Sequence, residues 1–343
     1  MDARGASSTV GGVSQTDQPR RRRRRRPLRW AAGFLVLMAV AGYFAVQRAS
    51  NGGGGAPYCT ASVNAAGGGK GGSGQYYEMS TEQAANAATI AAVGVSKGMP
   101  DRAVTIALAT AMQESMLRNL DHGDRDSLGL FQQRPSQGWG TPAQIMDPVY
   151  SAGIFYDRLA EVKGYSRLPL TVAAQKVQLS AFPQAYAKHE PDATVLTTAF
   201  TGSGHLVCAG PAPARAGDPA KLRAELSRLV AKNGPHTVPA EPAGAAGGPA
   251  ASASSGEAGE TEVSVVAKGG GGEAAARSGQ VLAQWAVANS RELGITRVSY
   301  SSSTWTAGPD GGRWKGKGAA GAKDGDGDPL DADPGRIRIF VRA

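Results

Sequence analysis

Residues 103–115 read Ala-Val-Thr-Ile-Ala-Leu-Ala-Thr-Ala-Met-Gln-Glu-Ser, and this stretch decides the fold. Its first ten residues are nearly all apolar, which predicts a helix buried around most of its circumference at the centre of a domain. The helix runs directly into an acid, Glu114. A carboxyl at the end of a buried helix loses hydration, so its pKa is expected to rise toward the protonated state that a general acid needs.

The flanking sequence extends this helix into a domain. Ser80-Thr-Glu-Gln83 fits a capping box that starts an earlier Ala-rich helix. Helical spacing of apolar residues returns at residues 150–162 and 171–180, and no period-two alternation is evident between them and Ser80. Residues 76–210 are therefore predicted to form one mainly α domain.

The positive charge of the chain is confined to its N-terminus. Residues 1–48 contain ten arginines and two aspartates, so they carry +8 of the net charge of +9 and leave +1 for the rest. A nucleic-acid-binding surface on the folded part is therefore not expected.

This basic segment precedes an apolar run. Seven consecutive arginines lead into 17 uncharged residues, Trp30–Val46, which reach about 25 Å as a helix. The positive-inside rule predicts a single-pass anchor in the cytoplasmic membrane, with residues 1–29 cytoplasmic and the bulk of the chain outside. Cleavage after Ala41, which ends an Ala-Val-Ala site, is the alternative and would give a secreted protein.

The predicted export of the chain favours a disulfide between its two cysteines. Cys59 and Cys208 both follow the anchor, and disulfides persist in that compartment. We predict that they form a bridge around the main domain, with two free thiols as the alternative.

Two segments have the composition of flexible chain. Residues 47–75 are Gly-rich and are predicted to be a tether, and residues 211–275 contain long Ala/Pro/Gly/Ser stretches and are predicted to be a linker. The linker contains one charged helical piece, 219–232. A small α+β domain, residues 276–343, follows; it is predicted to contain a helix over 280–293 and strands over 295–300 and 335–341.

An ordered set of motifs accompanies Glu114. Glu114-Ser115 is followed 15 residues later by Gly129-Leu-Phe-Gln132, then by Asp147-Pro148, by Ala152-Gly153 and by Tyr156. With this set, residues 80–205 resemble the lytic transglycosylase and goose-type lysozyme-like superfamily, here in the setting of an actinobacterial membrane-anchored envelope protein. The resemblance implies a lysozyme-like fold for the main domain.

The resemblance also implies a chemistry. Glu114 would protonate the β-1,4 bond between N-acetylmuramic acid and N-acetylglucosamine in peptidoglycan strands, and would then act as base to give a 1,6-anhydro product. Such enzymes use one carboxylate, unlike most glycosidases, and the resemblance implies no cofactor and no metal. Ser115 would orient the acid or the acetamido group of the substrate, and Gln132 would hydrogen-bond sugar, whereas Phe131 is expected to pack under the cleft.

The chain departs from the family at the end of the domain. The family has an Ala-Tyr-Asn-Ala-Gly segment there, in which Tyr touches the acid and Asn the substrate. Gln178 and Ser180 are the polar residues of this region, and Tyr186 would supply the phenol. A non-catalytic peptidoglycan-binding or scaffold protein that retains the fold is therefore the alternative function.

Other polar residues have weaker cases. Asp124 and Asp126 are placed where an inverting hydrolase would hold a second carboxylate, but a solvated loop is the simpler interpretation. The small C-terminal domain resembles a module of actinobacterial wall proteins whose final strand tends to carry a His pair. Arg336 and Arg338 occupy those places, so no metal is expected, and the partner of this domain is not identified.

Overall fold

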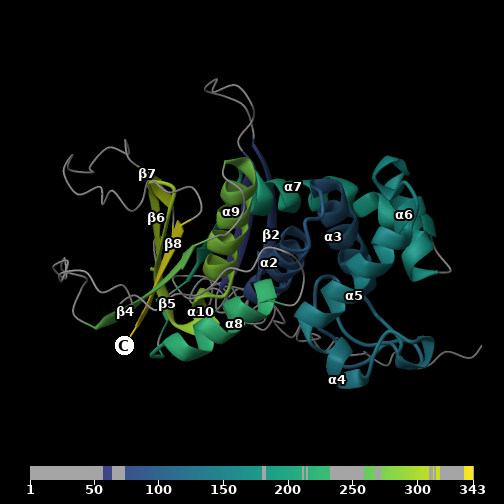
Figure 1. Ribbon diagram of the computed structural model, residues 1–343, viewed down its shortest axis with the longest axis horizontal. Coiled ribbons are helices and arrows are strands. Elements are labelled where there is room, and N and C mark those ends of the chain that lie inside the picture. The colour runs from purple at the N-terminus through teal and green to yellow at the C-terminus, as the bar shows by residue number, and fades with distance from the viewer. Residues whose placement is uncertain are drawn as a thin grey trace, which may run out of the picture. The chain divides into compact units, whose positions relative to one another are not determined.

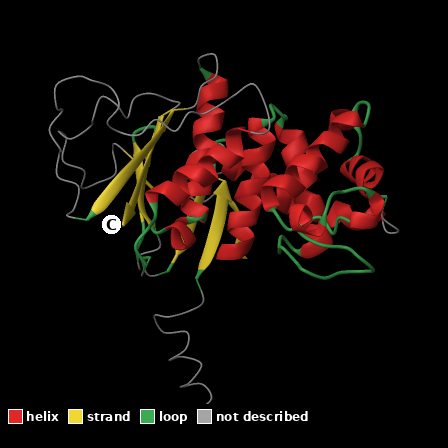
Figure 2. Cartoon of the chain, turned by 60° about the horizontal axis from the view of Figure 1, so that its bottom comes forward, coloured by secondary structure: helices red, strands yellow, loops and turns green. Residues whose placement is uncertain are grey.

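The computed structural model combines helices with two antiparallel sheets (Figures 1 and 2). It describes residues 57–63, 74–179, 183–210, 212–213, 215–231, 259–266, 272–308, 312, 314–316 and 336–342. The predicted anchor, Trp30–Val46, lies outside these ranges. Within them, no helix combines the length and apolar character that crossing a membrane would require.

A three-stranded sheet joins the two ends of the predicted main domain. Its order is β2-β1-β3, with β1 (Tyr58–Val63) paired antiparallel to β2 (Gln75–Ser80) and to β3 (His205–Ala209). Cys59 and Cys208 stand opposite each other in the β1–β3 register and form a disulfide. The predicted bridge is thus confirmed.

Strand β1 corrects the predicted tether, because residues 58–63 belong to the folded unit. The strand alternates in burial, with Cys59 and Ala61 fully buried. One of its two partners, β3, lies about 150 residues away in sequence, a pairing that the Gly-rich flanks of β1 gave no reason to expect.

The helices between β2 and β3 build the predicted α-helical core. Residue ranges are α2 (Thr81–Ser96), α3 (Asp101–Ser115), α4 (Pro142–Ile145), α5 (Pro148–Glu161), α6 (Leu170–Gln178) and α7 (Glu190–Thr201), with 3₁₀ turns η1 (Pro135–Gln137), η2 (Tyr165–Arg167) and η3 (Pro183–His189). The capping box is confirmed, since Ser80 and Gln83 bond reciprocally at the start of α2. Most of α3 is fully buried, as its apolar circumference predicts.

Close packing between α2 and α5 depends on a glycine. A Cβ at Gly94 would lie 2.6 Å from the hydroxyl oxygen of Tyr156, so only glycine admits that side chain. Tyr156 is fully buried, and its hydroxyl donates to the Ile90 carbonyl at 3.0 Å. The motif residue Tyr156 therefore has a packing role.

The C-terminal segment forms a five-stranded sheet in the order β4-β8-β5-β6-β7. Its elements are α8 (Pro219–Ala231), β4 (Glu260–Val266), α9 (Glu273–Ala288), α10 (Ser290–Leu293), β5 (Ile295–Tyr300), β6 (Ser303–Thr306), β7 (Trp314–Gly316) and β8 (Arg336–Arg342). The predicted helices and two predicted strands are present, with Gly294 ending the helical part at φ +67°. Strand β4 falls within the predicted linker and corrects it; its Val263 and Val265 are buried and it pairs with β8.

Helix α9 attaches this sheet to the α-helical core. It lies against α2 and α7 (Figure 1), and buried residues of both segments belong to one continuous apolar core. The Trp285 indole donates to the Thr89 hydroxyl at 3.2 Å, and the Gln284 side chain accepts from the Leu206 amide at 2.9 Å. The described residues from 57 to 342 therefore belong to one compact unit, where the sequence predicted two separate domains.

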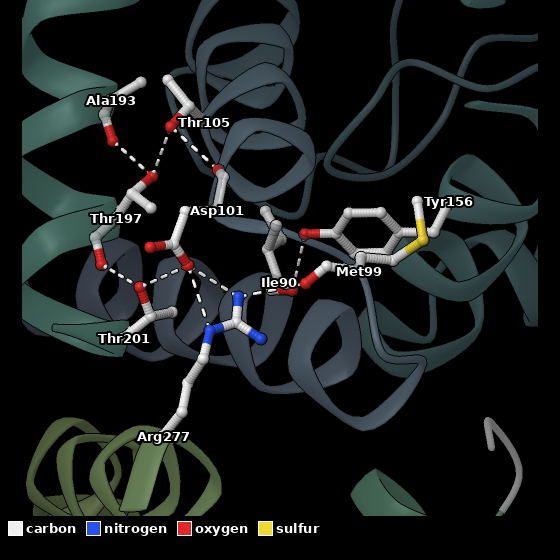
Figure 3. A network of polar contacts seen from close by, with 9 residues as sticks. All are labelled: Ile90, Met99, Asp101, Thr105, Tyr156, Ala193, Thr197, Thr201 and Arg277. Carbon is white, nitrogen blue, oxygen red and sulfur yellow. Dashed lines mark hydrogen bonds and ion pairs between the residues drawn. The ribbon is translucent and has the colours of Figure 1, made fainter. Parts of the chain in front are cut away.

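A polar network fixes α9 against the start of α3 (Figure 3). The Arg277 guanidinium donates to the Asp101 carboxylate at 2.7 Å and to the Met99 carbonyl at 3.0 Å. The Thr201 hydroxyl donates to the same carboxylate at 2.9 Å. This network satisfies polar groups where α3, α7 and α9 meet.

Removal of the disulfide should lower stability. The bridge closes a loop with a sequence separation of 149. Restricting the unfolded chain over that length corresponds to about 5 kcal/mol in the loop-entropy treatment. The Cys59→Ala/Cys208→Ala double variant should therefore lose up to about that much free energy of unfolding in urea. Wild-type protein with a reducing agent is the control, and equal stability of its oxidised and reduced forms would contradict the prediction.

Candidate functional site

Strained backbone surrounds the end of α3. Met116 and Leu117, which follow Ser115, both adopt left-handed conformations, with φ of +54° and +60°. Side chains of α2 hold this reversal: the Gln83 amide donates to the Met116 carbonyl and the Asn86 amide to the Leu117 carbonyl, each at 2.8 Å. Residues without glycine's freedom keep such conformations only where their surroundings enforce them.

Left-handed backbone recurs at the ends of α3 and α6 and in the loop that contains the Gly129–Gln132 turn. Of the seven non-glycine residues with positive φ in the described ranges, five lie between residues 116 and 179: Met116, Leu117, Arg125, Gln132 and Leu179. Such clustering is typical of functional sites, where strain orients particular side chains.

The motif Gly129–Gln132 forms a tight turn beside the helix end. Leu128 and Gln133 pair through both backbone bonds, each 2.9 Å, and the Gly129 amide donates to the Leu120 carbonyl. Gly129 has φ +76°, and a Cβ there would lie 2.7 Å from the Ile145 carbonyl oxygen. The turn therefore requires glycine at this position.

The side chain of Ser115 ties the helix to this turn. Its buried hydroxyl is the donor in hydrogen bonds to the Leu130 carbonyl, at 2.7 Å, and to the Ala111 carbonyl, at 3.1 Å. Phe131 is fully buried and stacks on Phe155 with ring centroids 4.6 Å apart, so it packs as expected. The turn is thereby fixed to α3 on one side and to α5 on the other.

Side chains from two later elements act on the Glu114 carboxyl. The Tyr186 hydroxyl, from η3, donates to Glu114 Oε1 at 2.6 Å. Gln178, at the end of α6, lowers the pKa of the same carboxyl, and its side-chain nitrogen donates to the Phe131 carbonyl at 2.7 Å. The structure thus brings together three of the predicted site residues.

Burial raises the pKa of Glu114 above the ordinary value of 4.5, and the bonds from Tyr186 and Gln178 oppose this rise. A raised carboxyl pKa means that the folded state binds its proton more tightly than the unfolded chain. The stability contributed by this group is therefore greatest below pH 4.5 and is lost as the pH rises through the raised value.

The remaining predicted residues are placed differently. Ser115 bonds backbone carbonyls of its own chain, and the Gln132 amide lies 3.3 Å from the carbonyl oxygens of His122 and Gly129. Ser180 lies outside the described residues. Substrate contacts of Ser115 and Gln132 therefore stay predictions.

The loop acids have structural partners. Asp126 accepts from Arg134 and from the Ser136 amide, each at 2.8 Å, and the Arg134 bond holds its pKa below the usual range. Asp124 is exposed and lies 4.0 Å from Arg125. Across the described ranges, no three His, Cys, Asp or Glu side chains gather as a metal site would require.

Arg338 of β8 takes part in a charged sheet face. Arg338 forms an ion pair with Glu262 of β4 at 2.9 Å, and Arg297 of β5 pairs with Glu260 at 2.8 Å. Both guanidinium groups also lie near the Phe340 ring.

Two supporting residues were missed by the sequence analysis. Asn86 and the amide nitrogen of Gln83 hold the backbone after Glu114. Asn86 is a buried polar residue in an Ala-rich helix. A buried polar side chain needs a hydrogen-bond partner, and this requirement is the feature by which the sequence could have identified Asn86. Its partner Leu117 lies 31 residues further along the chain, so the sequence did not identify it.

No protein-family model matches the sequence, and a search of curated proteins finds no matching relative.

Ser115→Ala should destabilise the protein, because the Leu130 carbonyl would lose a buried donor. We expect a loss of about 1–3 kcal/mol in the free energy of unfolding, measured by urea denaturation. Thr110→Val is the matched control, since the buried Thr110 hydroxyl donates to the Ile106 carbonyl within its own helix, and it should cost less. A Ser115→Ala variant of unchanged stability but weaker glycan binding would support substrate contact instead.

Proposed function

We propose that this protein is a peptidoglycan-cleaving lytic transglycosylase with a lysozyme-like fold, in which Glu114 is the single acid and base. The proposal rests on the motif resemblance of residues 80–205. It places the folded unit outside the cytoplasmic membrane, anchored by residues 30–46, and the Cys59–Cys208 disulfide is compatible with an oxidising compartment.

One observation carries the proposal. The carboxyl of Glu114 is partly buried, has a raised pKa and accepts a hydrogen bond from the phenol of Tyr186. The superfamily places a Tyr against its catalytic acid, and this chain supplies one although it lacks the Tyr-Asn segment. The contact therefore supports Tyr186 as the counterpart of that residue.

The arrangement suits chemistry with one carboxyl. Protonated Glu114 would give its proton to the glycosidic oxygen as the bond to the sugar carbon breaks. The carboxylate would then take the proton of the 6-hydroxyl as that oxygen bonds the same carbon, so that the 1,6-anhydro ring forms without consuming water. Tyr186 and Gln178 would stabilise the carboxylate between the two steps, because donors favour the charged form. Asp126 is bound to Arg134 and is not required.

A non-catalytic glycan-binding protein is the second candidate. The side chains of Ser115 and Gln132, which the resemblance assigns to substrate, make hydrogen bonds to the protein's own backbone. Binding to sacculi without release of fragments would favour this function.

Glu114→Gln should abolish cleavage while leaving the fold intact, because the amide has the shape of the acid but is far too weakly acidic to transfer a proton to the leaving group. With the full-length chain and purified peptidoglycan, mass spectrometry should find soluble anhydro-muropeptides. We expect their rate of release to fall by about 100-fold or more in the variant. Hydrated reducing ends would indicate a muramidase, and no soluble product from the parent chain would exclude both enzymes.

Cleavage should decline as the pH rises through the pKa of Glu114, which lies above 4.5. Tyr186→Phe removes a bond that lowers this pKa, so the alkaline limb of the profile of kcat/KM against pH should move to higher pH. Thr110→Val is the control for loss of a buried hydroxyl and should keep the parent profile. A shift of the limb to lower pH in Tyr186→Phe would contradict the assigned role.

A further inference from the structure

Two exposed apolar side chains lie at the ends of α3 and α6. Met116 follows Ser115, the last residue of α3, and is 47% exposed. Leu179 follows Gln178, the last residue of α6, and is 80% exposed. Single exposed apolar residues are ordinary on protein surfaces, so these two matter only through their backbone and their position.

Both residues occupy positions where glycine is usual. Each is the C-cap of its helix and adopts a left-handed conformation with φ +54°. Helices commonly end in glycine at such positions, because a Cβ makes the left-handed conformation costly. The chain therefore carries a large, exposed apolar side chain at two positions where glycine would be less strained, a pattern typical of functional sites.

Hydrogen bonds hold the ends of both helices at one turn. The Ser115 hydroxyl donates to the Leu130 carbonyl at 2.7 Å. The Gln178 side-chain nitrogen donates to the Phe131 carbonyl, also at 2.7 Å. These two carbonyls are consecutive in the Gly129–Gln132 turn, and α6 also packs against α3. The last residues of α3 and α6 therefore lie beside the same piece of backbone.

The two exposed side chains consequently lie near the candidate acid. Met116 is two residues beyond Glu114, and its carbonyl accepts from the Gln83 side chain at 2.8 Å. The Leu179 amide donates to the Gln175 carbonyl at 2.8 Å, which closes α6. The backbone of each residue is thus fixed, and a ligand that reaches the Glu114 carboxyl would pass close to both side chains.

We propose that Met116 and Leu179 form an apolar contact for the N-acetyl methyl groups of the glycan strand. The inference rests on the proposed function, from which it takes its ligand. Hydroxyl and ether oxygens cover much of an N-acetylated sugar, and the methyl groups are its most apolar parts. Removal of these methyls from water against apolar side chains is favourable and non-directional, so the pair would add affinity for acetylated strands.

Sedimentation with purified sacculi tests this contact. The full-length Glu114→Gln protein serves as the reference, because its strands should stay uncleaved. Met116→Gly/Leu179→Gly, made in this reference, removes both side chains and suits the left-handed backbone. We expect its affinity for sacculi to fall about 10- to 20-fold, since each side chain would bury the equivalent of about one CH₂ group. Its melting temperature should be unchanged or raised.

Sacculi with N-formyl in place of N-acetyl groups isolate the methyl, because they keep the amide. The reference should bind them about 10-fold more weakly than native sacculi. The glycine variant should bind both kinds about equally, since it has already lost the apolar contact.

Ser302→Gly is the matched control. Ser302 is exposed and left-handed, with φ +62°, in the turn between β5 and β6. Its replacement relieves the same backbone conformation away from the Gly129–Gln132 turn and should leave both affinities unchanged. If the glycine variant does not fold, Met116→Gln/Leu179→Gln replaces it. That variant keeps long side chains, removes their apolar character and should lose affinity to a similar extent.

Unchanged affinity for native sacculi in a folded double variant would overturn the inference, as would equal weakening by N-formylation in the reference and the variant. Absence of anhydro-muropeptides from the wild-type chain would refute the proposed cleavage alone, and the affinities would still decide whether the methyl contact exists. A reference protein with no affinity for sacculi would overturn both.

Discussion

Burial of helix α3 is the constraint on which the rest of the structure depends. Helices α2, α5, α6 and α7 and the η3 turn all pack against it, and its apolar residues from Ala103 to Met112 are almost without exposure. A helix enclosed in this way can present charged residues only near its two ends. Glu114 lies in the last turn, desolvated enough for its pKa to rise and close enough to η3 to accept a hydrogen bond from Tyr186.

Features that depend on residues close together in the sequence were predictable, whereas pairings between residues far apart in the sequence were not. The capping box at Ser80 involves residues three apart, and the apolar run of α3 is continuous, so both were evident. Strands β1 and β4 were missed because each is short, lies among Gly-rich or Ala-rich residues and pairs with a strand far along the chain. The same limit applies to the site. Glu114 was identified from its neighbours, whereas the bond of Gln178 to Phe131 spans 47 residues and was not evident in any motif.

The shared core changes how the two halves of the chain relate. The sequence predicted a small C-terminal domain on a long flexible linker. Such a domain would take many positions relative to the α-helical core. Instead, Trp285 is buried beside α2, and Arg277 bonds the first turn of α3, the helix that ends in Glu114. Through α9, the sheet of β4 to β8 is thus part of the support of the α-helical core.

The disulfide has a mechanical consequence if the chain is anchored through residues 30–46, as proposed. Cys59 is the second residue of β1, close to where the chain enters the folded unit, and Cys208 lies in β3, where the helical segment ends. A pulling force between the N-terminal segment and the C-terminal sheet would pass from Cys59 directly to Cys208 through covalent bonds. The enclosed residues, with Glu114, Gln178 and Tyr186 among them, would bear no share of that load along the backbone.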